Sequence, residues 1–473
     1  MANIEHFVVL MLENRSFDHI FGLRQGVNGI KDSQGNPVLV NVDDGGREVP
    51  IQGGAPFSIP TKHGRGPFHN VVDVNEQLFG DKEAQGQAKG SGFVSSYREA
   101  LGQDTRGDFT DQDVDVVMKV FSPTDLPAIN ALADHFVLCE QWFCEVPGPT
   151  HPNRLYVHAG TSEGFAHNVF KRPFDSLTIY ELVERAGKTW AVYDFDLNEV
   201  KNFTRLANKM ENFRRFKPRF AQDIEKGELP NYSFIVPRFN STHYAPQNDQ
   251  HAPADVRWGE QLIADVYDAL RAHDETWGKC ALIVTYDEHG GFPDHEIPPG
   301  ASNPDDIDSP RPDDNGGNHH PPEFKFDRLG LRVPALIVSP WVERGMVCKD
   351  KLQHTSILKT VREAFGIEKS LSKREEEATS FSHLFIETTV RTDAPQKLPR
   401  PKMTQLAPAT HHANPGNHMP DDLQTEMLDG LLQATRLSHP EDEDTPVETP
   451  PTQAEVSALA HQRWARHEKW VKS

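Results

Sequence analysis

The sequence predicts an α/β fold: a doubly wound, mostly parallel sheet with helices on both faces, long loop insertions and a helical C-terminal tail. Short, continuously apolar runs recur along the chain, for example at residues 7–12 and 281–286. Runs of this kind are typical of strands that are covered on both faces. Amphipathic helical patterns lie between them, and alternation of strand and helix is typical of doubly wound sheets.

Composition limits the classes of function. A chain of 473 residues with 37% hydrophobic content can build a sizeable core, as one large α/β domain with insertions or as two domains. The net charge of −21 argues against nucleic acid and strongly anionic membranes as partners, because both would be repelled over long range. Contact with a zwitterionic membrane stays open.

The N-terminal segment lacks a basic region, and the apolar run 7–12 is too short for a signal peptide or a membrane helix. We therefore expect a cytoplasmic location, or export without a cleavable N-terminal signal. The four cysteines match no zinc-finger spacing, and we expect them to be reduced residues of the core.

The expected elements follow one another in regular order. Strands are predicted over residues 7–12, 189–193, 232–236, 281–286 and 333–339. Helices are predicted after Ser16, after the Ser-Pro-Thr-Asp start at residue 122, and over residues 177–186, 259–273 and 354–365. Gly366 is placed to end the last of these helices.

Two stretches predict irregular structure. Residues 22–92 are rich in Gly, Asp, Asn and Pro and show little periodicity, so we expect a long insertion that covers the mouth of the sheet. Residues 303–322 have the composition of a surface loop.

Beyond residue 394 prolines recur at short intervals, which indicates a linker rather than a core. We therefore predict a main domain over residues 1–395 and a Pro-rich tail over residues 396–473. The tail contains two helical patterns, at residues 421–437 and 452–471. Each carries an apolar stripe that must be buried, so we expect the tail to mediate homo-oligomer formation or to cover the site.

Acidic and amide side chains directly follow two of the predicted strands. Glu13 and Asn14 follow residues 7–12, and Asp287 and Glu288 follow residues 281–286. Ligands of open α/β sheets bind outside the carboxyl ends of strands, so these four side chains are candidate ligand-binding residues. The alternatives are a simple turn for the first pair and a charged loop for the second. Two glycines follow His289 and would let a ligand approach the backbone.

Thr150 lies among prolines in the stretch PGPTHPNR, residues 147–154. Prolines restrict the backbone, so the hydroxyl would be held rigidly. A threonine is a poor nucleophile unless a base or a metal ion activates it, and the carboxylates after the strands could provide that activation. Taken alone, the stretch is better explained as a rigid surface turn.

Seven motifs resemble the bacterial phosphoesterase family, which comprises phosphatidylcholine-type phospholipases C and related acid phosphatases of the alkaline-phosphatase superfamily. They are MLENRSFDHIFG, SPTDLPAINALADHF, EVPGPTHPNRLYVHAGTS, NDQHAPADVRWGE, YDEHGGFPDHEIPP, VPALIVSPWV and HTSILKTVREAFG. The resemblance covers about residues 4 to 390, and the tail lies outside it.

The resemblance implies a set of site residues and one divalent metal ion. The implied metal ligands are Glu13, Asn14, Thr150, Asp287 and Glu288, with Thr150 also the nucleophile. The family's pocket histidines correspond to His69, His251, His289 and His354, with Asp255 nearby, and His251 is the expected proton donor. An oxygen ligand shell favours Mg or Ca and leaves Zn or Mn open.

Several functions remain open at this point. A phospholipase C would cut a phosphodiester through a phosphothreonine, and threonine at the nucleophile position favours it; an acid phosphatase would cut phosphomonoesters. A sulfatase is disfavoured, because Thr150 cannot be oxidised to the formylglycine that its chemistry needs, although Thr150-x-Pro152-x-Arg154 echoes the sulfatase signature. A catalytically inactive metal-binding interaction module is the non-enzymatic alternative.

Overall fold

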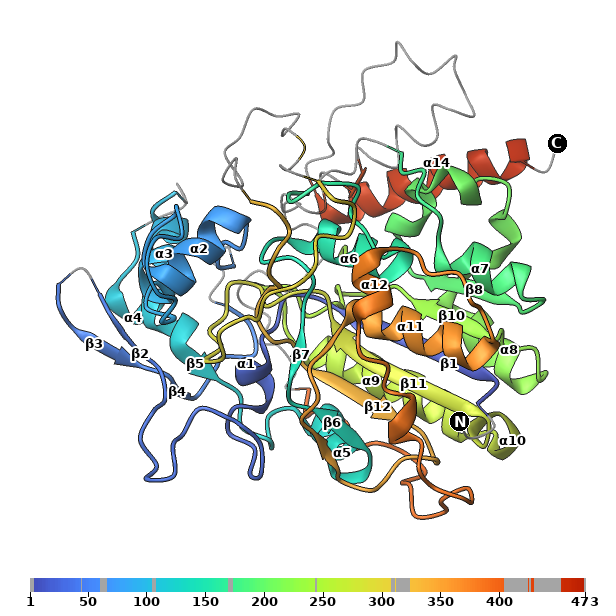
Figure 1. The fold of residues 1–473 in the computed structure, drawn as a ribbon, viewed down its shortest axis with the longest axis horizontal. Coiled ribbons are helices and arrows are strands. Elements are labelled where there is room, and N and C mark those ends of the chain that lie inside the picture. The colour runs from blue at the N-terminus through green and yellow to red at the C-terminus, as the bar shows by residue number, and fades with distance from the viewer. Residues whose placement is uncertain are drawn as a thin grey trace, which may run out of the picture.

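A sheet of eight strands forms the centre of the chain in a computed structural model (Figure 1). The structure describes residues 4–43, 45–59, 66–103, 108–168, 173–242, 245–307, 311, 324–403, 424, 427–428 and 452–471. In spatial order the strands are β13 (Val347–Cys348), β6 (Val137–Cys139), β12 (Ala335–Val338), β11 (Cys280–Tyr286), β1 (His6–Leu12), β10 (Tyr232–Ile235), β8 (Trp190–Asp194) and β9 (Phe213–Arg215).

The sheet is parallel except at one strand. β1 lies between β10 and β11 and runs parallel to both, while β12 is antiparallel to its neighbours β11 and β6. The side chains of β11 are buried at every position, and those of β1 at every position after His6, as expected for strands covered on both faces. The prediction of a doubly wound, mostly parallel sheet is confirmed.

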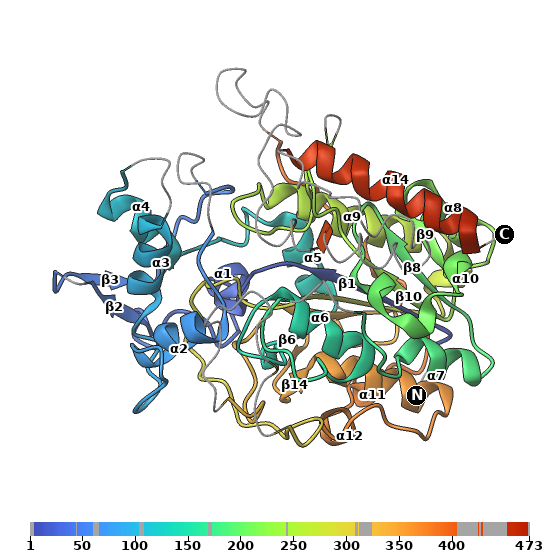
Figure 2. The same ribbon diagram turned by 90° about the horizontal axis from the view of Figure 1, so that it is seen from above.

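Helices cover both faces of the sheet, as Figure 2 shows. One face carries α5 (Pro127–His135), α8 (Phe216–Glu225) and α9 (Arg257–Arg271); the other carries α6 (Thr150–Ala159), α7 (Ile179–Arg185), α11 (His354–Phe365) and α12 (Lys373–Glu377). α10 (Asp274–Trp277) follows α9 directly. In α11 the apolar face of Ile357, Leu358 and Val361 is buried, and Gly366 ends the helix with φ +67°, as predicted.

Short elements connect these layers. The helix predicted after Ser16 is α1 (Phe17–Phe21), and the Ser16 hydroxyl caps it by accepting from His19 N. A pair of two-residue strands, β7 (Trp142–Phe143) and β14 (Leu352–Gln353), joins the segment before α6 to the start of α11. The 3-10 helices are η1 (Val116–Met118), η2 (Glu199–Asn202), η3 (Thr204–Leu206), η4 (Met210–Asn212) and η5 (Ser382–Leu384).

The insertion after α1 has more regular structure than its composition predicts. It forms a lobe, blue in Figure 1, with its own hydrophobic cluster around Val74, Phe93 and Val117. Its elements are β2 (Val40–Val42), β3 (Glu48–Pro50), β4 (Gln52–Gly53), α2 (Val71–Phe79), α3 (Phe93–Gly102), α4 (Asp111–Asp115) and β5 (Lys119–Val120). The expectation of an irregular insertion is therefore wrong over residues 71–79, where Asn70 and Asp73 form a capping box.

The tail returns to the body of the protein. In α14 (Gln453–Val471), Val456 and Ala460 are buried in the main hydrophobic cluster. Gln453 Oε1 accepts from Ser241 N at 2.9 Å, and His461 Nε2 lies 3.1 Å from the carbonyl of Phe195. Apart from residues 424 and 427–428, the helix predicted over 421–437 lies outside the described residues. None of the described helices combines the length and apolar character that crossing a bilayer requires.

Candidate active site

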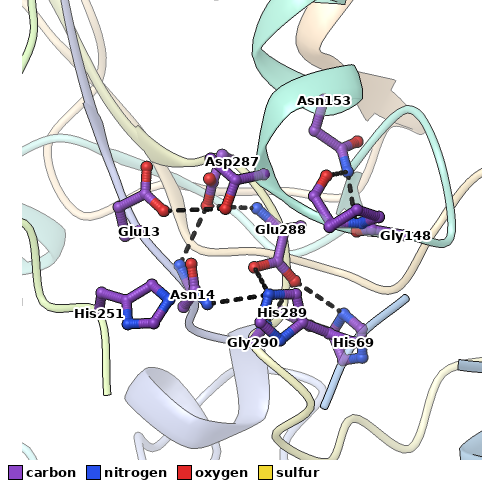
Figure 3. A network of polar contacts seen from close by, with 12 residues as sticks. Glu13, Asn14, His69, Gly148, Asn153, His251, Asp287, Glu288, His289 and Gly290 are labelled. Carbon is purple, nitrogen blue, oxygen red and sulfur yellow. Dashed lines mark hydrogen bonds and ion pairs between the residues drawn. The ribbon is translucent and has the colours of Figure 1, made fainter. Parts of the chain in front are cut away.

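The acidic side chains that follow β1 and β11 lie side by side. Leu12 pairs with Tyr286 in the parallel register, so Glu13 and Asp287 leave the sheet at the same edge (Figure 3). Glu13, Asn14, Asp287 and Glu288 are all buried. The structure thus brings together the four residues predicted from the ends of these two strands, and we call them the carboxylate cluster.

Backbone donors hold the carboxylate cluster in place. Asp287 Oδ1 accepts from Asn14 N at 3.0 Å and from Glu288 N at 2.7 Å, and Glu288 Oε2 accepts from Gly290 N at 2.6 Å. Asn14 has φ +56°, a left-handed conformation that is uncommon outside glycine and clusters at functional sites.

The two glycines after His289 allow other backbone segments to pack closely against this turn. A Cβ on Gly290 would lie 2.4 Å from the carbonyl oxygen of Asn14, and one on Gly291 would lie 2.5 Å from that of Phe68. The backbone of the protein itself therefore occupies the space that a side chain would need, and the approach of a ligand to these glycines stays a prediction. Both residues have positive φ, +66° and +71°, which also favours glycine.

Thr150 is the first residue of α6 and is buried, so the alternative of a surface turn is wrong. Its Oγ1 donates to Glu13 Oε2 at 3.1 Å. The preceding turn is held by Asn153, whose Nδ2 lies within 3.1 Å of the carbonyls of Val146, Gly148 and Pro149. The hydroxyl is thereby held against the carboxylate cluster.

Arg154 is a site residue that our sequence reasoning did not select. Its guanidinium is fully buried and contacts Glu13 Oε1 at 2.6 Å, Glu199 Oε1 at 3.0 Å and Asp287 Oδ2 at 3.5 Å. The signal was present in the Thr150-x-Pro152-x-Arg154 pattern, because residues four apart share a face of a helix. Arg154 supplies the positive charge that a cluster of buried carboxylates needs.

The electrostatics of the carboxylate cluster favour binding of a further positive charge. Burial raises the pKa of Glu13 well above its usual value, although Arg154 opposes this. Burial likewise raises the pKa of Asp287 to about 6, and the two side chains share a hydrogen bond. For Glu288 burial acts in the same direction, but the contacts with His69, His289 and Gly290 N outweigh it and lower the pKa.

The donor atoms fit a hard divalent cation. Among the described residues, Asn14 Oδ1, Asp287 Oδ2 and Glu288 Oε1 are buried oxygens without a hydrogen bond of good geometry, although Arg154 and His69 lie 3.5 Å from the second and the third. Unsatisfied buried acceptors are costly, and a cation would compensate them. Carboxylate, amide and hydroxyl oxygens are the ligands that Mg²⁺ and Ca²⁺ prefer. Glu13 and Thr150 complete the predicted set.

Two of the predicted histidines flank Asn14 in Figure 3. His69 Nε2 lies 3.3 Å from Asn14 Nδ2 and 3.5 Å from Glu288 Oε1, and its ring centroid lies 6.3 Å from that of His251. His251 Nδ1 lies 2.6 Å from its neighbouring carbonyl at Ala252.

His289 and His354 contact the carboxylate cluster through Glu288 and Asp287. His289 Nε2 bonds Gln77 Oε1 at 2.9 Å, and its Nδ1 lies 3.4 Å from Glu288 Oε2. His354 Nδ1 accepts from Trp142 Nε1 at 3.2 Å, so its Nε2–H donates to the carbonyl of Asp287 at 2.7 Å. Burial lowers the pKa of His354 to about 4. A neutral ring with both nitrogens engaged is suited to positioning and not to proton transfer.

Asp255 is paired with a neighbouring arginine. Its carboxylate accepts from Arg257 Nη2 at 2.5 Å and from Arg257 Nε at 2.9 Å, so its charge is already compensated. The role of Asp255 in the catalytic set stays a prediction.

A buried threonine hydroxyl and buried carboxylates thus lie together at the carboxyl edge of an α/β sheet, where ligands of such folds bind. The chain belongs to the Phosphoesterase family, whose model matches residues 4–368. It is a hydrolase acting on phosphoester bonds.

Two relatives of this chain are named as phospholipases C. The chain is 34% identical to non-specific phospholipase C3 of Arabidopsis thaliana, over 92% of this chain and 82% of the relative. It is 31% identical to phospholipase C B of Mycobacterium tuberculosis, over 78% and 74% of the two chains. Among solved structures, the phosphonate monoester hydrolase of Agrobacterium radiobacter overlaps with a TM-score of 0.33 at 10% identity, over 56% and 73% of the two chains.

Proposed function

We propose that the protein is a metal-dependent phospholipase C that cleaves phosphatidylcholine-like phosphodiesters through a phosphothreonine intermediate. The observation that carries the proposal is the hydrogen bond from Thr150 Oγ1 to Glu13 in a buried carboxylate cluster. The relatives named phospholipase C support the choice of a diester over a monoester.

One divalent ion would be held by Glu13, Asn14, Thr150, Asp287 and Glu288. When bound, it would neutralise charge on the phosphoester and lower the pKa of the threonine hydroxyl. The unsatisfied oxygens of Asn14, Asp287 and Glu288 support this assignment.

In the proposed first step, Thr150 Oγ attacks phosphorus in line, and its proton leaves along the hydrogen bond to Glu13. The bond between phosphorus and the glycerol oxygen breaks, and His251 Nε2 protonates that oxygen as diacylglycerol departs. In the second step, His251 removes a proton from water, and the resulting hydroxide displaces Thr150 from phosphorus. Glu13 returns its proton to the departing Thr150 oxygen, which restores the hydroxyl. The sum is hydrolysis of one phosphodiester by one water.

His69 is the second histidine on the solvent side of the cluster. Its Nδ1 lies 3.0 Å from the carbonyl of Pro67, and its Nε2 faces Asn14 and Glu288. We assign it to orienting the amide of Asn14 and the phosphate oxygens. His289 and His354 keep Glu288 and Asp287 in place through their own contacts.

The partners follow from this substrate. A phospholipid presented in a zwitterionic surface is compatible with the net charge of −21, whereas an anionic surface would repel the protein. Homo-oligomer formation through the tail is a further part of the proposal. Its test is the size of the full-length chain in solution before and after removal of the tail.

The experiment compares turnover of p-nitrophenyl phosphate and p-nitrophenyl phosphorylcholine by the metal-stripped chain, with Mg²⁺, Ca²⁺, Mn²⁺ or Zn²⁺ added back. We expect the phosphorylcholine ester to be preferred. Thr150→Ala should lose about 10³-fold or more in kcat, while Thr150→Ser, which keeps the hydroxyl, should retain measurable turnover. Preference for the monoester would favour an acid phosphatase, and no turnover with any metal would favour an inactive binding module.

A further inference from the structure

Three metal-ligating side chains meet at the edge of the sheet, apart from the carboxylate cluster. Cys348 ends the edge strand β13, Asp350 lies in the turn before β14, and His383 lies in η5. One ligand atom from each lies within 4.8 Å of the other two. Cys348 is buried, whereas the side chains of Asp350 and His383 are 49% and 51% exposed, so an ion could enter from solvent.

The contact between His383 and Asp350 needs a positive charge. His383 Nδ1 lies 3.2 Å from the carbonyl of Ser380, so Nδ1 carries a proton and donates it to that carbonyl. The lone pair on Nε2 then faces Asp350 Oδ2 at 2.7 Å. Two acceptors at this distance require either a second ring proton or a cation. A backbone carbonyl that fixes one ring nitrogen is a common feature of metal-binding histidines.

The thiol of Cys348 is the third donor. Cys348 pairs with Cys139 in the parallel register of β13 and β6, and the two side chains share a hydrogen bond. Both cysteines are free, although they lie opposite each other. A thiol, an imidazole and a carboxylate form a mixed ligand set that suits Zn²⁺ and its neighbours in the first transition series, and not Mg²⁺ or Ca²⁺.

In a second group of three ligating side chains, the negative charge of the carboxylates is already compensated. Asp18, Asp294 and His295 also lie within 4.8 Å of one another. The buried guanidinium of Arg332 contacts Asp294 Oδ1 at 2.8 Å and Asp18 Oδ1 at 3.1 Å, so positive charge is already present. Among the described residues, Asp350 forms an ion pair with His383 and with no arginine or lysine.

We propose that Cys348, Asp350 and His383 bind a zinc-class transition-metal ion, with water in the fourth position. The ion would tie the edge strand β13 to the segment that carries η5. β13 has only two residues paired with β6, so cross-linking it to a distant part of the chain would stabilise the fold. The site is independent of the phosphoesterase reaction, whose ligands are oxygen atoms only.

The test uses the full-length chain, stripped of metal with a chelator and titrated with Co²⁺. Thiolate ligation gives an intense sulfur-to-cobalt charge-transfer band, which an all-oxygen site cannot give. We expect the band in the unmodified chain, its loss in Cys348→Ser, and at least about tenfold weaker Co²⁺ binding in His383→Gln. His273→Gln, a half-buried histidine at the start of α10, is the matched control and should behave as the unmodified chain.

A second measurement is the shift of Tm on adding Zn²⁺ to the same variants. We expect Zn²⁺ to raise Tm more in the unmodified chain and in His273→Gln than in His383→Gln, because a ligand of the folded state stabilises it. Absence of the charge-transfer band in the unmodified chain would show that the contact is only an imidazolium–carboxylate pair and would overturn the proposal. A band that survives in Cys348→Ser would overturn the assignment of the thiol.

Discussion

Arg154 is the residue on which the carboxylate cluster depends most. Its guanidinium is fully buried and is shared among Glu13, Glu199 and Asp287. Removing the positive partner of buried carboxylates leaves uncompensated charge, so Arg154→Met should lower the free energy of unfolding by about 3–5 kcal/mol. Urea denaturation measures this change. Arg24→Met, which breaks a more exposed pair with Asp134, should cost under about 1 kcal/mol; equal losses would contradict the assigned role.

A substitution at Gly290 tests whether the site depends on the close contact between Gly290 and the backbone of Asn14. Gly290→Ala would place a Cβ 2.4 Å from Asn14 O, so Asn14 must move and activity should fall at least about tenfold, with a loss of roughly 2 kcal/mol or more of stability. Gly366→Ala is the matched control, since Gly366 has nearly the same φ, +67°, with no atom within 4 Å of the added Cβ. It should cost about 1 kcal/mol and leave kcat unchanged. Similar kinetics for both variants would refute the steric argument.

At the scale of elements, Glu260 joins two helices on one face of the sheet. It lies in α9 and accepts from Ala128 N at 2.6 Å and Ile129 N at 3.2 Å in the first turn of α5. Burial raises its pKa to about 8, although these two donors lower it. The folded chain therefore binds a proton that the unfolded chain releases near pH 4.5.

The sign of the pH effect follows from that difference. The stability that Glu260 contributes is fully present below about pH 4.5 and is lost as pH rises through about 8. Glu260→Gln cannot ionise, so its Tm relative to the unmodified chain should rise between pH 6 and pH 9, as measured by calorimetry. A difference in Tm that stays constant over this range would show that Glu260 is ionised throughout, held by the helix N-terminus.

The elements also show how far the sequence determines the site. The strands before Glu13 and Asp287 were predicted because continuous apolar runs depend on local composition alone, and their adjacency follows from the parallel sheet. Arg154 and Gln77 were missed because their roles depend on contacts with residues more than 100 positions away, at Glu13 and His289. The pairing of Asp255 with Arg257 was likewise not predicted, because residue type alone does not reveal it.

At the scale of the whole molecule, the tail contributes to the core. Val456 and Ala460 of α14 are buried with the main hydrophobic cluster, and Gln453 bonds to Ser241. Removing residues 404–473 would expose the apolar surface that α14 covers, and exposure costs about 25 cal/mol per Å². We therefore expect the truncated chain to unfold at lower temperature and lower urea concentration than the full-length chain.

The same truncation tests what the tail does besides packing, because it leaves all the predicted metal ligands in place. Size-exclusion chromatography with light scattering would show whether the oligomer, if one forms, persists without residues 404–473, and kcat/KM below the new Tm would show whether the tail restricts access to Thr150. A double variant, Val456→Asp with Ala460→Asp, is the matched full-length control, because it removes the packing of α14 and keeps the chain. If α14 acts only by covering apolar surface, both changes should lower Tm similarly and leave kcat/KM unchanged; a rise in kcat/KM in both would identify the tail as a cover of the site.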